Sequence, residues 1–202
     1  MHYERRVFDR YLAVSEEKQL FRTIKQFVHL LARRDHAWMR LLRQTGIRGG
    51  VLCGLTVHDA ELALKENYLR VRAQINKGGR EYTVYLNKPA RQALQDLLRI
   101  RREMGHPQHP DAPLVMSRNH QGISMRSLQS RMRHWTRVAG LGVEASPHWF
   151  RHTLAKRLFS QSTAQDPRGI AQRALGHASI NSTAIYTLPD REAMERAMEE
   201  AS

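Results

Sequence analysis

The chain has 202 residues, of which 41% are apolar and only seven are proline, so it is a folded protein with one sizeable domain rather than a disordered chain. Its single cysteine, Cys53, excludes an internal disulfide framework, and no apolar run approaches the roughly 18 residues of a membrane span, so we expect a cytoplasmic protein without a membrane partner. Thirty-three basic residues against nineteen acidic ones give a net charge of +14, which favours a polyanion such as nucleic acid as the partner.

Residues 15–45 predict two helices. The first begins at Ser15, a suitable N-cap, and its apolar residues recur on one face: Leu20, Ile24, Phe27, Leu30 and Leu31. We expect Asp35 to cap the second helix, which covers residues 36–44 and ends at Gly46. Cys53, which follows among apolar neighbours, is interpreted as a small buried residue rather than a nucleophile.

Two segments farther along alternate apolar and polar residues with a period of two. They cover residues 68–75 and 82–86, and the intervening residues 76–81, NKGGRE, have the composition of a turn. This pattern predicts a β-hairpin.

Helical spacing returns in residues 89–104, with Pro89 in the first turn. The loop at 105–113 holds three prolines and two histidines, His106 and His109. These histidines lack the cysteine or carboxylate cluster of a metal site, so we expect no metal there.

From residue 124 onward, helical patterns cover 127–140, 147–159 and 166–176, and a last one covers 190–202. The predicted fold class is α+β, mainly α-helical, with a small antiparallel hairpin. Residues 190–202 carry a net charge of −3, whereas residues 1–189 carry +17. We therefore divide the chain into a basic domain, 1–189, and an acidic C-terminal helix or tail, 190–202.

Six residues in this order have side chains suited to phosphoryl transfer: Arg48, Lys77, His148, Arg151, His177 and Tyr186. Each alone has an ordinary structural interpretation, such as a solvated charge, a structural histidine or a half-buried packing tyrosine. Together they match the needs of a tyrosine that attacks a phosphodiester. Guanidinium groups bind the non-bridging oxygens bidentately, imidazoles accept the phenolic proton, and a lysine protonates the leaving oxygen. We expect no metal and no other cofactor in this site.

The chain resembles the catalytic domain of the tyrosine recombinases (phage integrase family) in four segments: TGIRGGVLCGLTVHDAEL, NKGGREYTVYL, SPHWFRHTLAKRLF and ALGHASINSTAIYT. The resemblance runs from about Tyr11 to Thr187, so it implies that residues 1–189 form the catalytic domain. In this family the segment after the nucleophile often docks on a neighbouring protomer or folds back, so we expect residues 190–202 to regulate cleavage by docking in cis or in trans.

The resemblance also implies the catalytic-domain fold of that family. By the same resemblance, Arg48 is the first catalytic arginine, Lys77 the hairpin lysine, and His148 and Arg151 the histidine and arginine of the H-x-x-R motif. His177 is the second histidine, and Tyr186 is the nucleophile that forms a 3′-phosphotyrosyl bond.

The resemblance implies site-specific recombination of double-stranded DNA without metal or ATP, by protomers that associate on DNA as dimers and then as a tetrameric synapse. Accessory DNA-bending proteins and a prokaryotic, nucleoid-associated setting are further expectations. Two alternatives stay open: a DNA-binding regulator or fragment with little activity alone, and a type IB topoisomerase. The spacing from the LGH segment to the tyrosine favours the recombinase.

Three features depart from the family pattern. Val51 stands where an acidic residue usually follows the first arginine, so other partners are expected to hold Arg48. About three extra residues around SQSTAQ lie between Arg151 and His177. The usual N-terminal helical domain has no room here, as in a short group of DNA invertases, so we expect either a short family member or a fragment.

Further DNA contacts are predicted on the helix that includes SLQSRMRHWTR. Leu128, Met132 and Trp135 share one face and suit the core, whereas the other face carries side chains that suit a DNA groove or its phosphates: Arg126, Gln129 and Arg133. Arg80, in the hairpin turn, is a fourth predicted DNA contact. A solvated basic face explains the same pattern.

Overall fold

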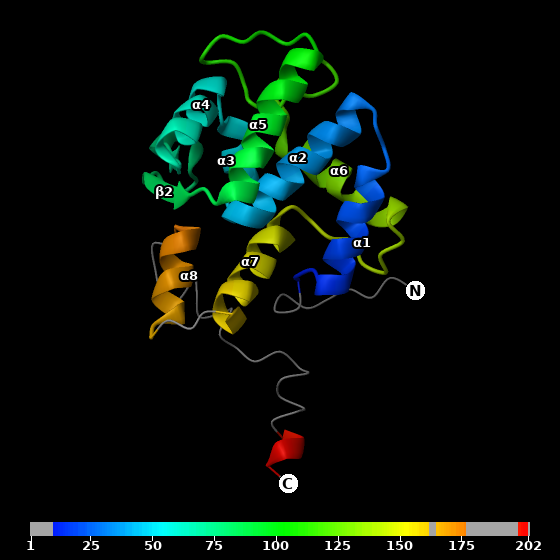
Figure 1. Ribbon diagram of the computed structural model, residues 1–202, viewed down its shortest axis with the longest axis vertical. Helices are drawn as coiled ribbons and strands as arrows, with labels where there is room; N and C mark the ends of the chain where they lie inside the picture. The colour runs from blue at the N-terminus through cyan, green and yellow to red at the C-terminus, as the bar shows by residue number, and fades with distance from the viewer. Residues whose placement is uncertain (1–9, 162–164, 177–197, 202) are drawn as a thin grey trace.

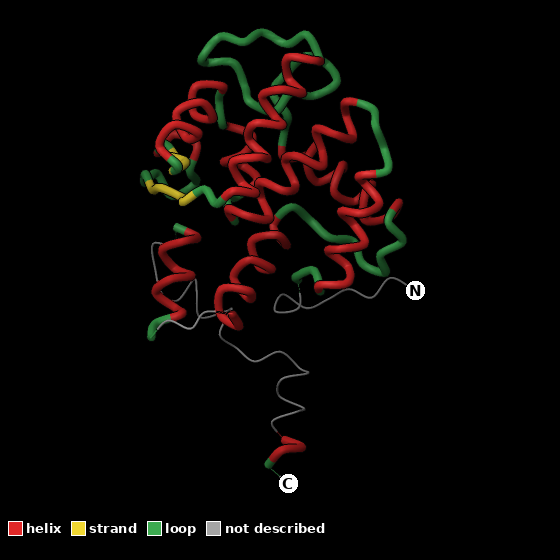
Figure 2. Tube along the Cα trace, in the orientation of Figure 1, coloured by secondary structure: helices red, strands yellow, loops and turns green. Residues whose placement is uncertain are grey.

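The computed structural model describes residues 10–161, 165–176 and 198–201. Figures 1 and 2 show helices gathered around a central helix, with a small two-stranded sheet at one side. The elements follow one another as α1 (Val14–Lys25), α2 (Leu30–Thr45), α3 (Gly49–Gly54), α4 (Val57–Glu66), β1 (Tyr68–Val71), the 3₁₀ helix η2 (Ala73–Ile75), β2 (Tyr82–Tyr85), α5 (Lys88–Glu103), α6 (Met125–Val138), α7 (His148–Gln161) and α8 (Pro167–Leu175). The predicted α+β class, mainly helical with an antiparallel hairpin, is confirmed.

The core is built around α2, against which α5 and α7 pack. Trp38 and Leu41 of α2 have no exposed surface. The start of α5 agrees with the sequence: Pro89 lies in its first turn, and Asn87 Oδ1 accepts the Ala90 N–H at 3.0 Å. Strands β1 and β2 pair antiparallel with Tyr68 opposite Tyr85.

The predicted boundary between the first two helices is wrong. Helix α1 ends at Lys25 and α2 begins at Leu30, so the break lies about eight residues before the expected one and leaves Phe27 38% exposed. His29 caps α2 through its side chain, which accepts the Ala32 N–H at 3.1 Å. Asp35 lies inside α2 with no exposed surface, where donors from the core bind its carboxylate.

Ser15 lies inside α1, and its predicted role as the N-cap is also wrong. The N-cap is Ala13, whose backbone N–H donates to Glu16 Oε2 at 2.8 Å. A glutamate at this position satisfies the free N–H of the cap residue itself, so the helix begins without a capping hydroxyl.

The first hairpin strand is shorter than predicted, because it ends at Val71 instead of residue 75. Arg72 turns inward, where its Nε donates to Asp59 Oδ1 at 3.0 Å and its Nη2 to the Gly54 carbonyl at 3.0 Å. Ile75 packs so closely on Gly54 that a Cβ added there would lie 2.6 Å from Ile75 Cγ2. These contacts draw η2 onto α3 and α4, so the turn that follows is held against the body of the protein.

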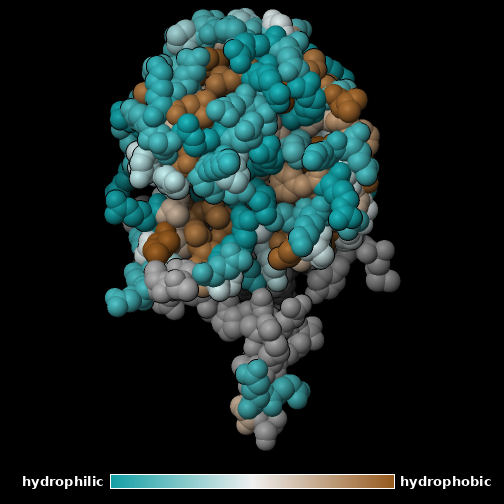
Figure 3. Space-filling view, viewed as in Figure 1, coloured by the Kyte–Doolittle hydropathy of each residue, from teal (hydrophilic) through white to brown (hydrophobic). Residues whose placement is uncertain are grey.

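The apolar face predicted in the DNA-contact helix is confirmed. In α6, Leu128, Met132 and Trp135 are at most 1% exposed, while the side chains of Arg126, Gln129 and Arg133 lie on the exposed face. Hydrophilic side chains also cover most of the molecular face drawn in Figure 3.

In the part of the chain that the structure describes, no helix is long and apolar enough to cross a lipid bilayer. The proposed division at residue 189 falls outside the described residues and stays a prediction, although residues 198–200 are helical.

Candidate active site

Arg48 occupies a fixed place directly after α2. Gly46 ends that helix in the left-handed conformation, with φ +62°, and a Cβ at this position would lie 2.6 Å from Leu175 Cδ2. Two residues later, Arg48 is the N-cap residue of α3 with extended backbone. The glycine therefore allows both the change of direction and the close approach of α8.

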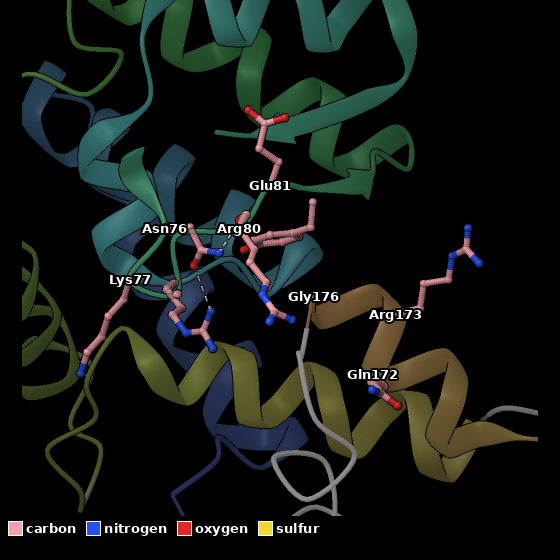
Figure 4. Close-up of a pocket in the computed structure, with 10 residues that line it drawn as sticks. Asn76, Lys77, Arg80, Glu81, Gln172, Arg173 and Gly176 are labelled. Carbon is pink, nitrogen blue, oxygen red and sulfur yellow. Dashed lines mark hydrogen bonds between the residues drawn. The ribbon is translucent and has the colours of Figure 1, made fainter. Parts of the chain in front are cut away.

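Asn76 connects Arg48 to the hairpin turn, a role that sequence reasoning missed. Its Oδ1 accepts from Arg48 Nη1 at 3.4 Å, and its Nδ2 donates to the Arg80 carbonyl at 2.7 Å (Figure 4). The Asn76 amide is thus a partner that holds Arg48 in place of an acidic residue at position 51. Val51 itself is buried in the core. An asparagine next to Lys77 in a turn was the available signal, since such side chains commonly bond to nearby backbone.

Two adjoining clefts meet at Arg48, Asn76 and Lys77. The cleft in Figure 4 also has Arg80, Tyr82 and Gly176 in its wall, and the side chain of Arg80 extends toward its centre. The other cleft has His148, Pro147 and Met125 in its wall. The structure therefore brings together Arg48, Lys77 and His148, which lie as much as 100 positions apart in the sequence.

Arg151 lies beneath this surface and is only 2% exposed. Its Nη1 donates to the Gly46 carbonyl at 2.7 Å and its Nη2 to the Leu175 carbonyl at 2.8 Å. These carbonyls lie at the C-terminal ends of α2 and α8, where intrahelical donors are lacking. The predicted catalytic arginine consequently also joins two helix ends, which the sequence did not indicate.

His148 begins α7 and is exposed on the side of the second cleft. Burial of part of the ring lowers its pKa, and the guanidinium groups of Arg151 and Arg48 lower it further. His148 is therefore a neutral imidazole at neutral pH, able to accept a proton. Its ring lies edge-on to that of His152, with 4.6 Å between the centroids.

The neutral histidines predict a pH dependence of stability. Burial lowers the pKa values of His36 and His152 to about 4, whereas an unfolded histidine titrates near 6.5. Between these values the unfolded chain binds more protons, so the free energy of unfolding falls as the pH is lowered from about 6.5 to about 4. We expect His152→Asn to flatten part of this dependence in thermal unfolding measured across that range. The exposed His58→Asn serves as the control, and an equally steep dependence in His152→Asn would contradict the assignment.

Tyr82 is the second residue that sequence reasoning missed. Its ring packs on Gly176, where an added Cβ would approach Tyr82 Cδ2 to 2.4 Å. Burial raises the pKa of its hydroxyl, although Arg151 and Arg48 partly oppose this shift. Among the described residues, that buried hydroxyl has no hydrogen-bond partner. The close packing of the Tyr82 ring on Gly176 holds the end of α8 against β2 at the edge of the cleft.

The remaining two predicted residues, His177 and Tyr186, lie outside the described residues. Gly176, the residue before His177, ends α8 with φ +61° and lies in the wall of the cleft with Arg48. Cys53 is only partly buried, and burial raises the pKa of its thiol to about 11, so it is protonated at neutral pH. Among the described residues, no group of three or more histidine, cysteine or acidic side chains is placed to hold a metal ion.

Arg133 lies on the exposed face of α6, where a DNA contact is predicted. If Arg133 contacts a DNA phosphate, Arg133→Ala should weaken duplex binding and reduce the slope of log K against log salt by about one. Binding titrations at several salt concentrations measure both. Arg102→Ala removes an exposed charge on α5 and provides the control. A slope equal to that of the control variant would exclude the contact.

The fold and the site define a class of protein: a helical domain that gathers arginine, lysine and histidine side chains at clefts beside a β-hairpin. The sequence model of the phage integrase family matches residues 10–193, so the chain belongs to that family.

Individual relatives agree with this assignment. The chain is 38% identical over 160 residues to tyrosine recombinase XerC of Shewanella amazonensis, an alignment that covers 79% of this chain and 50% of the relative. XerC of Thermodesulfovibrio yellowstonii is 34% identical over 160 residues, with 78% and 50% covered. The chain thus spans about half the length of these curated relatives.

Among solved structures, the crystal structure of XerA recombinase superposes with a TM-score of 0.74 at 26% identity, covering 95% of this chain and 65% of that one. The XerH site-specific recombinase bound to its difH substrate, in a pre-cleavage complex, has the same fold, with a TM-score of 0.69 at 21% identity and coverage of 96% and 52%.

Proposed function

We propose that this chain is the catalytic part of a site-specific DNA recombinase that cleaves and rejoins strands through Tyr186. The observation that carries the proposal is the meeting of Arg48, Lys77 and His148 at two adjoining clefts. The match of residues 10–193 to the phage integrase family supports it.

The proposed reaction is a transesterification at one DNA phosphate. The Tyr186 oxygen attacks the phosphorus as its proton passes to an imidazole, for which neutral His148 is suited. The bond from phosphorus to the 5′ oxygen breaks, leaving a 3′-phosphotyrosyl bond and a free 5′-hydroxyl. Lys77, exposed in the hairpin turn, supplies the proton for the leaving oxygen. A 5′-hydroxyl from the partner strand reverses the step, so the bond energy is conserved and no ATP is consumed.

In the proposed reaction, the arginines stabilise the negative charge that develops on the phosphate. The attacked phosphate gains negative charge on its non-bridging oxygens, and a guanidinium binds two such oxygens in a fixed geometry. Arg48 faces the clefts directly, whereas Arg151 reaches a phosphate by sharing or exchanging its bonds to the Gly46 and Leu175 carbonyls. His177 is proposed to add a hydrogen bond to the same oxygens.

The proposed partners are double-stranded DNA and further copies of this chain. The net charge of +17 on residues 1–189 favours a duplex, and the XerH relative was solved on its DNA substrate. Strand exchange between two duplexes needs four protomers, so association as a dimer and then a tetramer on DNA belongs to the proposal. Accessory DNA-bending proteins are proposed only as helpers of that assembly.

A nicked suicide substrate tests the proposal. Cleavage near the nick releases a short fragment that diffuses away, so the covalent intermediate accumulates and can be counted as a protein–DNA adduct on a denaturing gel. We expect an adduct on a substrate carrying the cognate site. Tight binding without adduct would favour the regulator, and relaxation of supercoiled plasmid by a monomer would favour the type IB topoisomerase.

A further inference from the structure

The turn between η2 and β2 presents Lys77 at its exposed tip. Residues 77–80 are all exposed, whereas Asn76, directly before them, is only 9% exposed. Among the described residues, a Cβ added at Gly79 would have no neighbour within 4 Å, and one added at Gly78 would approach only Asn76 Nδ2, at 3.8 Å. The tip of the turn therefore lacks packing contacts, and hydrogen bonds must determine its conformation.

Asn76 makes three hydrogen bonds at the base of this turn. Its N–H donates to the Ala73 carbonyl at 3.2 Å, and its carbonyl accepts the Gly79 N–H at 2.8 Å. Its side-chain Nδ2 donates to the Arg80 carbonyl at 2.7 Å. Most residues at position 76 would make the two backbone bonds, but the third requires a short side chain that ends in a donor. The Asn76 carboxamide thus closes the turn from one end to the other.

The closed turn directs its two basic side chains to opposite sides of Asn76. In Figure 4, Lys77 extends away from Arg80, which points into the first cleft. Asn76 and Lys77 lie in the walls of both clefts. The carboxamide oxygen of Asn76 accepts from Arg48 Nη1 at 3.4 Å. Asn76 therefore lies between the arginine proposed to bind the phosphate and the lysine proposed to protonate the leaving oxygen.

We infer that Asn76 is a positioning residue for proton transfer, because its bond to the Arg80 carbonyl holds the turn in the conformation that brings Lys77 to the leaving 5′ oxygen. The inference rests on the proposed function. Asn76 acts through Lys77, and does not itself donate the proton. A proton donor must come within hydrogen-bond distance of the atom that it protonates. A displacement of about 1 Å costs on the order of 10²-fold in rate.

A substrate with sulfur in place of the 5′ bridging oxygen isolates this role. When the phosphorus–oxygen bond breaks, the alkoxide must gain a proton. When a phosphorus–sulfur bond breaks, the thiolate leaves without one, because thiols titrate near 8.5 (about the cysteine value). We expect Lys77→Ala to slow cleavage of the oxygen substrate by about 10²-fold or more and to cleave the sulfur substrate at nearly the wild-type rate. Arg48→Ala should be slow on both, because the phosphate charge develops in either case.

Asn76→Ala is expected to behave like a weaker Lys77→Ala. In single-turnover cleavage at saturating protein, it should be roughly 10–10²-fold slower than wild type on the oxygen substrate and close to wild type on the sulfur substrate. Asn76→Asp keeps an acceptor for Arg48 but has no donor for the Arg80 carbonyl, so it should be as slow as Asn76→Ala on the oxygen substrate. Thr83→Ala, at an exposed position of β2, is the control and should match wild type on both.

Hydrogen–deuterium exchange tests the turn without any DNA. We expect the segment 76–80 to exchange faster in Asn76→Ala and Asn76→Asp than in wild type or Thr83→Ala, because the turn opens more often without the side-chain bond. Circular dichroism verifies that each variant is folded.

Three results would overturn the inference: cleavage of the oxygen substrate by Asn76→Ala at the control rate, a defect of equal size on both substrates, or full activity of Asn76→Asp. The last would assign the effect to the Arg48 contact. Failure of the proposed function has a different signature. If wild type forms no adduct on either substrate, the proposed function fails, and exchange alone decides whether Asn76 holds the turn. If wild type forms adduct and the Asn76 variants match the control, the positioning role fails and the proposed function remains.

Discussion

Replacing Tyr186 by phenylalanine is expected to remove the covalent protein–DNA adduct, because a phenyl ring has no oxygen to attack phosphorus. The rate of adduct formation should fall on the order of 10⁵-fold or more, as for other enzymes that lose their nucleophile. Duplex affinity should not change, since the basic clefts are untouched. The nicked suicide substrate measures the adduct, and a binding titration measures the affinity.

Tyr82→Phe is the matched control for this experiment. Tyr82 lies in the wall of the cleft beside Arg48, so it is the tyrosine to test as an alternative nucleophile. Its hydroxyl is buried and the pKa is raised by that burial, which disfavours the phenolate. We expect Tyr82→Phe to keep forming adduct. Loss of adduct in Tyr82→Phe with persistence in Tyr186→Phe would transfer the role to Tyr82.

Arg151→Ala is expected to impair both catalysis and stability. Loss of a transition-state donor lowers the cleavage rate by about 10²–10³. The buried Gly46 and Leu175 carbonyls also lose their donors, which costs about 3 kcal/mol of unfolding free energy and roughly 6–12 °C in Tm. Single-turnover cleavage and thermal unfolding measure the two effects separately.

Arg48→Ala provides the comparison. Arg48 is only partly buried, and its bond to Asn76 is long, at 3.4 Å. We therefore expect a similar loss of cleavage with a stability change below about 1 kcal/mol. Arg151→Lys, which keeps the charge but cannot bridge both carbonyls in the same way, should regain only part of the stability. An Arg151→Ala protein as stable as wild type would show that the two carbonyls find other donors.

The relation between sequence and structure differs from one segment to another. Where one local signal dominated, the prediction was confirmed: Gly46 ends α2, Pro89 lies at the start of α5, and the apolar spacing of α6 gives its buried face. The six candidate catalytic residues likewise came from residue type, order and resemblance. The structure places Arg48, Lys77 and His148 in the walls of adjoining clefts. His177 and Tyr186 remain sequence predictions.

Two of the errors arose where distant residues decide local structure. Asp35 resembles a helix cap in sequence, but donors as far away as Arg131 and Trp135 stabilise its carboxylate inside α2. Strand β1 ends early because Arg72 reaches Asp59 and Gly54 on the preceding elements. Neither contact has a signature within a window of a few residues, so local propensity gives the wrong boundary.

By itself, then, the sequence determined the helical class, the hairpin, the basic character of the chain and the identity of the residues suited to phosphoryl transfer. Side-chain chemistry and local periodicity belong to the sequence itself and do not depend on the tertiary structure. Only the tertiary structure decided that Asn76 joins Arg48 to the hairpin and that Arg151 holds the ends of α2 and α8. It also decided that the buried Asp35 of α2 accepts a hydrogen bond from Arg131 of α6. Each of these depends on a hydrogen bond whose donor and acceptor are distant in the sequence and are brought within 3.4 Å or less only by folding.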